Sequence, residues 1–125
     1  MRLKRNRLST YHIKKAVPQK DAEGGSYIEY SPTAPITAEM WSGGGKLQTE
    51  MYGNRLPNIR NLRLDGAYYE VPGGINGKVT YQMEDGPEIA AGDGVCIYAA
   101  ADQEPDYQIV AVYPYSYLTL EVEKR

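Results

Sequence analysis

Apolar and polar residues alternate one by one along several short stretches of this chain. In residues 78–84, Val79, Tyr81 and Met83 alternate with polar residues. Successive side chains of a β-strand point to opposite faces, so the pattern predicts half-buried strands of an antiparallel sheet. The same alternation occurs in residues 36–40, in residues 47–52, and in residues 117–124, where it places Leu118, Leu120 and Val122 on the inner face.

Residues typical of turns separate these stretches. Ser42-Gly43-Gly44-Gly45 lies between residues 36–41 and 46–52, which predicts a hairpin of these two segments. Pro114-Tyr115-Ser116 predicts a second hairpin, of residues 107–113 and 117–124. Further turns are expected in the middle of the chain, at Asp65-Gly66, Pro72-Gly73-Gly74, Asp85-Gly86-Pro87 and Gly92-Asp93-Gly94.

Three other segments complete the expected architecture. Residues 8–17 and 95–99 are predicted strands, and the second is so apolar that both of its faces should be covered. Residues 58–64 have some helical spacing but are too few for a stable helix, so a turn or a short strand is expected. The sequence therefore predicts an all-β fold, a small antiparallel β-barrel or sandwich of about seven to eight short strands with at most one short helix.

Charge is divided unevenly along the chain. Residues 1–20 contain seven Lys or Arg and no acid, whereas the remaining residues contain the other seven basic residues and all 16 Asp and Glu. We expect residues 1–7, with Arg2, Lys4, Arg5 and Arg7, to form a flexible basic N-terminal arm on a single barrel domain of residues 8–125. Such a leader is either solvated or binds an acidic partner, which includes a neighbouring copy of the chain.

The chain is expected to be made in the cytosol. Its charged start is not followed by an apolar run, so we expect neither a secretory signal nor contact with a membrane. A single cysteine, Cys96, excludes an internal disulfide and a multi-cysteine zinc site. The 12 Tyr and absence of Phe favour a thin core with wet edges and interfaces.

No motif predicts catalysis or a bound cofactor. The only histidine, His12, and Cys96 would have to meet to form a catalytic pair, and a thiol in an apolar strand is usually inert. The segment Ser42 to Lys46 resembles a phosphate loop only faintly, because it lacks the required first glycine and a following Ser or Thr. We therefore expect no enzyme activity, no cofactor and no metal.

Two clusters remain as interaction sites. Asp102, Glu104 and Asp106 have a spacing that calcium loops use, but without their glycine turn and distal glutamate, so a solvated acidic loop is expected. Its charge complements the basic arm. Tyr113, Tyr115 and Tyr117 gather at a turn and suit stacking on sugars or bases, or a protein interface.

The ordered series of segments resembles the head–tail joining (head-closure, or stopper) proteins of tailed bacteriophages. The series begins with Arg7-Leu8-Ser9-Thr10-Tyr11-His12-Ile13 and the turn Asp21-Ala22-Glu23-Gly24-Gly25, which leads to Tyr30. It continues with a strand ending at Trp41, a glycine turn and Glu50-Met51-Tyr52-Gly53. It closes with residues 92–98, then Pro105-Asp106-Tyr107, and a final alternating strand.

The resemblance implies a small β-barrel that assembles into a ring without enzymatic activity. Such rings lie at the head–tail interface of the virion, beneath the portal and adaptor, retain the packaged DNA and form the platform for the tail-terminator or tail-tube protein. They assemble in the cytoplasm of the bacterial host. One loop projects into the channel, and the candidates by position are residues 42–46 (Gly43, Gly44, Gly45, Lys46), residues 53–58 (Asn54, Arg55) and residues 72–77. The turn-rich stretch 72–94 departs from shorter relatives.

Two other functions stay open. The basic arm and the tyrosines would suit a nucleic-acid-binding barrel, although the rest of the chain has a formal charge of about −9. The cluster at Tyr113–Tyr117 would suit a module that binds carbohydrate.

Overall fold

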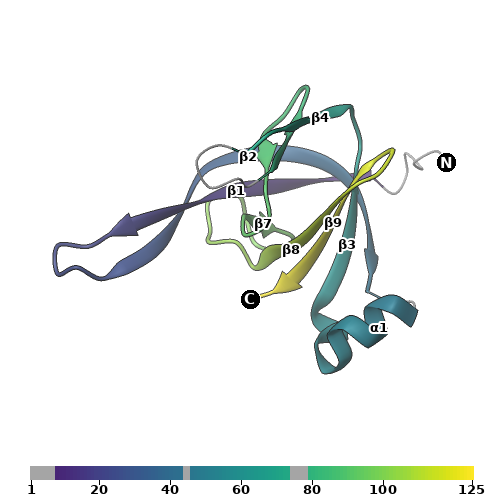
Figure 1. Ribbon diagram of the computed structural model, residues 1–125, viewed down its shortest axis with the longest axis horizontal. Helices are drawn as coiled ribbons and strands as arrows, with labels where there is room; N and C mark the ends of the chain where they lie inside the picture. The colour runs from purple at the N-terminus through teal and green to yellow at the C-terminus, as the bar shows by residue number, and fades with distance from the viewer. Residues whose placement is uncertain (1–7, 44–45, 74–78) are drawn as a thin grey trace.

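The computed structural model describes residues 8–43, 46–73 and 79–125, and these residues form an all-β fold, as predicted. The elements along the chain are β1 (Leu8–Lys20), β2 (Ser26–Ser42), α1 (Lys46–Tyr52), the 3-10 helix η2 (Gly53–Asn58), β3 (Ile59–Leu64), β4 (Tyr68–Val71), β5 (Thr80–Met83), β6 (Glu88–Ile89), β7 (Gly94–Cys96), β8 (Tyr107–Pro114) and β9 (Leu118–Lys124) (Figure 1).

Six strands close into an antiparallel barrel in the order β1-β2-β3-β9-β8-β7. The predicted hairpin of residues 107–124 is confirmed, since β8 and β9 pair from Tyr107 with Lys124 to Pro114 with Leu118. Residues 58–64 contain the strand β3, which lies between β2 and β9. Closure leaves no free edge along the paired parts of the strands, which is how small β-proteins avoid edge-to-edge aggregation.

The inner face of the barrel follows the predicted alternation. Leu118, Leu120 and Val122 of β9 are fully buried. They pack with residues from five other barrel strands and from the second sheet. The buried cluster consists of Ile13, Ile36, Ala38, Leu62, Leu64, Met83, Ile89, Val95, Tyr107, Ile109, Leu118, Leu120 and Val122.

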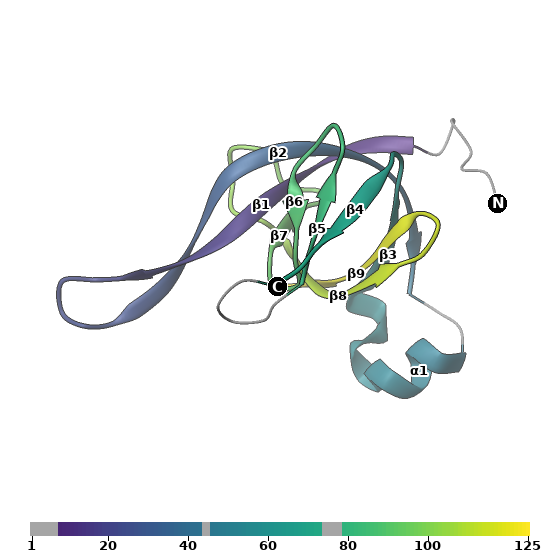
Figure 2. The same ribbon diagram turned by 45° about the horizontal axis from the view of Figure 1, so that its top comes forward.

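The strands β4, β5 and β6 form a separate three-stranded sheet from the turn-rich middle of the chain. Met83 of β5 and Ile89 of β6 belong to the same buried cluster as the barrel residues, so this sheet packs against the barrel (Figure 2). Val79, which the alternation grouped with Tyr81 and Met83, precedes β5 and is 37% exposed.

The prediction of a hairpin from residues 36–41 and 46–52 is wrong. Residues 36–41 belong to β2, but its hairpin partner is β1, and Lys46–Tyr52 is the helix α1. Lys, Leu, Gln, Glu and Met are strong helix formers, and Leu47 and Met51 are also spaced as neighbours on a helix. β2 ends at Ser42, and the following Gly43 lies so close to the start of β3 that an added Cβ would be 3.0 Å from Ile59 Cβ.

The predicted strand 95–99 is too long. β7 ends at Cys96, and Tyr98 is 71% exposed, so this segment is not covered on both faces. The carboxylate of Asp106 accepts hydrogen bonds from the backbone N–H groups of Ile97, Tyr98 and Ala99, at 2.8, 2.9 and 3.3 Å. These contacts turn the chain away from the strand direction.

The strands β1 and β2 extend beyond the barrel as a hairpin that we call the arm (residues 16–30; Figure 1). Within the strands that the structure describes, β1 pairs with β7 only at residues 12–14, and β2 pairs with β3 only at residues 38–42. A register shift between Lys14 and Ala16 marks the point where the arm leaves the barrel. Bulges of this kind bend a strand and increase its twist.

The tip of the arm is a turn organised by Asp21. One of its carboxylate oxygens accepts the backbone N–H groups of Glu23 and Gly25 at 2.9 and 2.7 Å, and Gly24 has a φ of +87°, which favours glycine. The sequence Asp21-Ala22-Glu23-Gly24-Gly25 was expected to form a turn, and the structure confirms it.

Candidate functional site

Several residues that the sequence singled out lie outside the described residues. They are Arg2, Lys4, Arg5 and Arg7 of the basic N-terminal leader (residues 1–7), Gly44 and Gly45, and most of the loop at residues 72–77. Gly43 directly follows β2, and Lys46 begins α1. The remaining candidates, Asn54 and Arg55, belong to η2.

The β2–β3 connection lies over the outer face of the barrel and is attached to it by polar side chains. Gln48 of α1 and Asn61 of β3 exchange hydrogen bonds of 2.7 and 3.3 Å. Arg55 of η2 forms a two-point ion pair with Glu123 of β9, in which Arg55 Nε donates to Glu123 Oε2 at 2.7 Å. None of the residues of η2 is buried. The connection is therefore anchored by directed polar contacts more than by apolar burial.

The ion pair shifts the pKa of both residues in the direction that favours their charged forms. The hydrogen bond and the positive charge of Arg55 lower the pKa of the Glu123 carboxyl, and Glu123 in turn raises the pKa of Arg55. The guanidinium also lies 5.4 Å from the centre of the Tyr52 ring. Arg55, a candidate channel-facing cation, is therefore neutralised by a carboxylate of its own chain.

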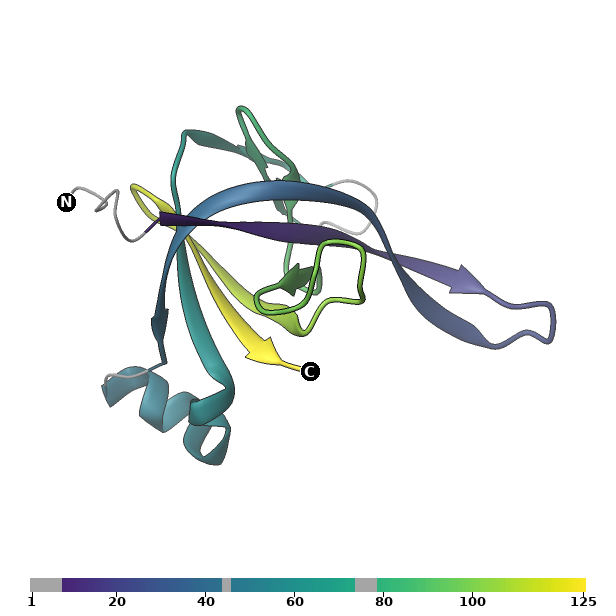
Figure 3. The same cartoon turned by 180° about the vertical axis from the view of Figure 1, so that it is seen from behind.

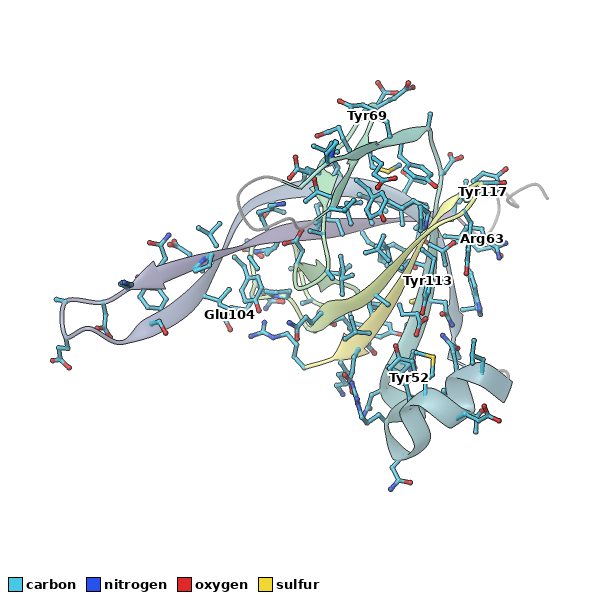
Figure 4. All side chains as sticks on the ribbon, viewed as in Figure 1. Tyr52, Arg63, Tyr69, Glu104, Tyr113 and Tyr117 are labelled. Atoms are coloured by element: carbon cyan, nitrogen blue, oxygen red, sulfur yellow. The ribbon has the colours of Figure 1, made fainter. Side chains whose placement is uncertain are left out.

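Glu121 of β9 lies beneath the same connection, and sequence reasoning did not single it out. It is 4% exposed and accepts hydrogen bonds from the hydroxyls of Tyr52 and Tyr113, both labelled in Figure 4. Burial and this hydrogen bond raise the pKa of Tyr52, and the hydrogen bond to Glu121 raises the pKa of Tyr113 to about 12. The Oε2 atom of Glu121 has no hydrogen-bond partner among the described residues.

The acidic loop, predicted as one solvated cluster, divides into two parts. Asp106 is half-buried and is engaged by backbone N–H groups, so its prediction as a solvated acid is wrong. Asp102 and Glu104 are exposed and line a hollow of about 400 Å³ between this loop and the arm. Figure 3 shows the loop between β7 and β8 beside β1, where the arm leaves the barrel.

Residues of β1 and β2 form the other side of the hollow. Glu29 and Tyr27 of β2 line it, together with Lys14 of β1. Lys14 is 7% exposed, and its ammonium has no hydrogen bond or ion pair with the described residues. The alternation of β1 identifies Lys14 as an outward residue, but only the covering loop explains why it is buried.

His12 and Cys96 face each other across the β1–β7 pairing, so the structure brings this candidate pair together. Burial raises the pKa of the Cys96 thiol, and its Sγ lies 3.8 Å from the carbonyl oxygen of Gln103. A raised pKa disfavours the nucleophilic thiolate. Cys96 is 2% exposed and lies beneath the β7–β8 loop.

The tyrosines at the second turn contact one another. The rings of Tyr113 and Tyr115 stack with centroids 5.6 Å apart and planes 10° apart. The hydroxyl of Tyr68 donates to the carbonyl oxygen of Tyr115, which ties this turn to β4. Tyr115 remains 62% exposed, so one tyrosine of the cluster presents a ring to solvent.

Neither a metal-binding cluster nor a helix that could span a membrane occurs among the described residues. No group of three or more His, Cys, Asp or Glu is arranged to hold a metal ion there. The helices of the described segments are too short and too polar to cross a membrane.

The chain was also compared with protein-family models, curated proteins and solved structures, and no match was found in any of the three.

Proposed function

We propose that this chain is a structural protein of the head–tail connector of a tailed bacteriophage. In this proposal it forms part of a ring that closes the DNA-filled head and provides the docking surface for the tail. It would act at the head–tail interface of the virion, after assembly in the bacterial cytoplasm. Its partners would be other copies of itself, the adaptor or portal above, and a tail-terminator or tail-tube protein below.

The observation that carries this proposal is the arm. An isolated two-stranded hairpin is at best marginally stable in water, yet this chain extends one well beyond its barrel. Tyr27 and Ile28 on the arm are 52% and 53% exposed. A hairpin with open edges and exposed apolar side chains is a typical contact element between subunits, since it can bury both against another chain.

The charges of the described residues are consistent with a channel through which DNA slides. Arg55 is paired with Glu123, and Lys15 lies 3.3 Å from Glu88 and 3.7 Å from Asp93. Cations neutralised within the chain bind phosphate weakly, because binding would require breaking these pairs. The β2–β3 connection, residues 43–58, is our candidate for the channel-facing segment. We propose no catalytic role for the chain.

The test is assembly with the proteins encoded beside it. The full chain would be co-expressed with neighbouring portal, adaptor and tail-tube proteins, and the complexes would be examined by negative-stain electron microscopy. We expect rings or extended connectors that contain this chain. Ile28→Asp should prevent incorporation, whereas Tyr69→Asp, at a residue 56% exposed on β4, serves as the matched surface control. Neighbouring genes unrelated to phage structure, or no incorporation of the wild-type chain, would refute the proposal.

A second candidate function rests on Tyr115. Its exposed ring, backed by Tyr113, offers a stacking platform of the kind that sugars and unpaired bases use. Binding in a glycan screen, or salt-dependent binding of single-stranded DNA, that is lost in Tyr115→Ala would favour this alternative over the connector.

A further inference from the structure

The hollow between the arm and the β7–β8 loop carries an unusual combination of charges. Its walls hold three carboxylates, Glu29 on the arm side and Asp102 and Glu104 on the loop side. Glu104, labelled in Figure 4, lies next to the base of the arm. Lys14 lines the same hollow, more than nine-tenths buried and without a partner among the described residues. We call this hollow the arm groove.

Both kinds of charge must be satisfied by whatever fills the arm groove. Three carboxylates against one ammonium favour a ligand with net positive charge. The side chain of Lys14 is more than nine-tenths buried and lines the groove, so its ammonium can donate hydrogen bonds to acceptors on a bound ligand. A basic peptide meets both conditions, since its side chains supply cations and its backbone supplies carbonyl oxygens.

We propose that the arm groove binds the basic leader, residues 1–7, of a second copy of this chain. The leader contains Arg2, Lys4, Arg5 and Arg7 and no acid. In an extended peptide, positions 2 and 4 face one side and positions 5 and 7 face the other. The leader therefore presents cations toward both walls of the groove, and its carbonyl oxygens toward Lys14.

The position of β1 favours a leader from another copy over the chain's own. The strand begins at Leu8 on one side of the barrel, and the arm projects from the opposite side (Figure 1). From Leu8 to Lys14 the strand rises about 20 Å, and a seven-residue segment spans at most about 24 Å. A leader that turned back along β1 would therefore bring only its first one or two residues to the groove. A leader that turned back would also meet β2 and β7, which already pair with β1 on its two sides.

A leader attached at Leu8 and a groove on the opposite side of the same subunit produce a head-to-tail contact between copies. Such contacts close into rings when the rotation between subunits allows it. This inference rests on the proposed ring assembly and names one contact within it. Exposed ion pairs are individually weak, so the leader would act as a set of several pairs, sensitive to salt.

The test uses a fluorescent peptide of residues 1–8 and the full-length chain in which the four leader cations are replaced by Gln, so that its own leader does not compete. Binding is measured by anisotropy at low salt. We expect Asp102→Lys/Glu104→Lys to weaken binding at least about tenfold. The matched control is Glu84→Lys/Asp85→Lys, an equal change of charge at exposed residues near β6, which should alter affinity less than about threefold.

A charge swap and a Lys14 variant complete the design. A peptide with glutamate at its four cationic positions should bind the reversed groove more tightly than the original one. Lys14→Met should weaken binding of the basic peptide, although it makes the groove more acidic, because the carbonyl oxygens lose their donor. Tighter binding to Lys14→Met, an equal loss in the two charge-reversed variants, or no binding at low salt would overturn the proposal.

These outcomes are separable from those of the proposed function. If connectors assemble while the peptide does not distinguish the groove from the control surface, the leader contact is wrong and the connector role stands. If the peptide binds the groove selectively but the chain never joins a connector, the leader contact stands and the connector role is wrong.

Discussion

The hydroxyl of Tyr52, in α1, donates a hydrogen bond to the carboxylate of Glu121, in β9. These residues are far apart in sequence, and their contact joins the β2–β3 connection to the outer face of the barrel. Glu121 is almost completely buried at this point, and Tyr113 donates to the same carboxylate. The helix and the sheet thus share a buried acid that depends on two hydroxyl groups.

Removing one of these hydroxyls should destabilise the fold. Tyr52→Phe leaves the buried Glu121 with one donor fewer, which should lower the free energy of unfolding by about 1–3 kcal/mol. Urea denaturation at neutral pH measures the change. Tyr69→Phe, at a tyrosine that is 56% exposed on β4, is the control and should have little effect. Equal losses in the two variants would show that the bond to Glu121 contributes nothing specific.

The ion pair of Arg55 and Glu123 should stabilise the protein only above acidic pH. Arg55 lowers the pKa of Glu123 in the folded state relative to the unfolded chain. The stabilisation is therefore complete above the ordinary carboxyl pKa and is lost as the pH falls through the lowered folded-state pKa. Wild type and Arg55→Gln should differ in urea midpoint at neutral pH and converge at strongly acidic pH. A difference that persists unchanged in acid would contradict this role.

Tyr113 should produce the opposite pH dependence at the alkaline end. Its pKa is raised to about 12 by the hydrogen bond to Glu121, so its neutral form is favoured in the folded state. The resulting stabilisation is present below the ordinary tyrosine pKa of about 10 and is lost as the pH rises through the folded value. Absorbance titration of the folded protein should show a late-ionising tyrosine that Tyr113→Phe removes. Loss of an early-ionising tyrosine instead would be inconsistent with the contact.

A Cβ at position 94 should disrupt the contact between β7 and the β7–β8 loop. Gly94 leaves room for Pro105, whose Cγ would overlap an added Cβ and whose own Cβ would lie 2.6 Å from it, and for the Tyr30 ring, at 3.1 Å. Gly94→Ala should therefore lower the free energy of unfolding by about 1–3 kcal/mol. In a background of Pro105→Ala the same substitution should cost less, because part of the clash is removed. Additive effects in this double-mutant cycle would exclude the clash as the cause.

The acidic and aromatic clusters show how far local sequence carried the candidate site. Asp102, Glu104 and Asp106 look alike in sequence, but only the fold gives Asp106 three backbone donors and leaves the other two beside the arm. Glu121 has the pattern of an outward polar residue on an alternating strand. Nothing near it in sequence indicates that a helix from another part of the chain covers it.

The sequence by itself determined the inner faces of β9 and of the second half of β2, because alternation at a period of two depends only on the local geometry of an extended backbone. It was ambiguous at residues 46–52, where six alternating positions are also compatible with a helix and where intrinsic propensity favours one. The tertiary structure alone decided which outer faces are covered. The burial of Glu121 and Lys14, and the hollow beside the arm, depend on segments distant in sequence that come together only when the barrel closes.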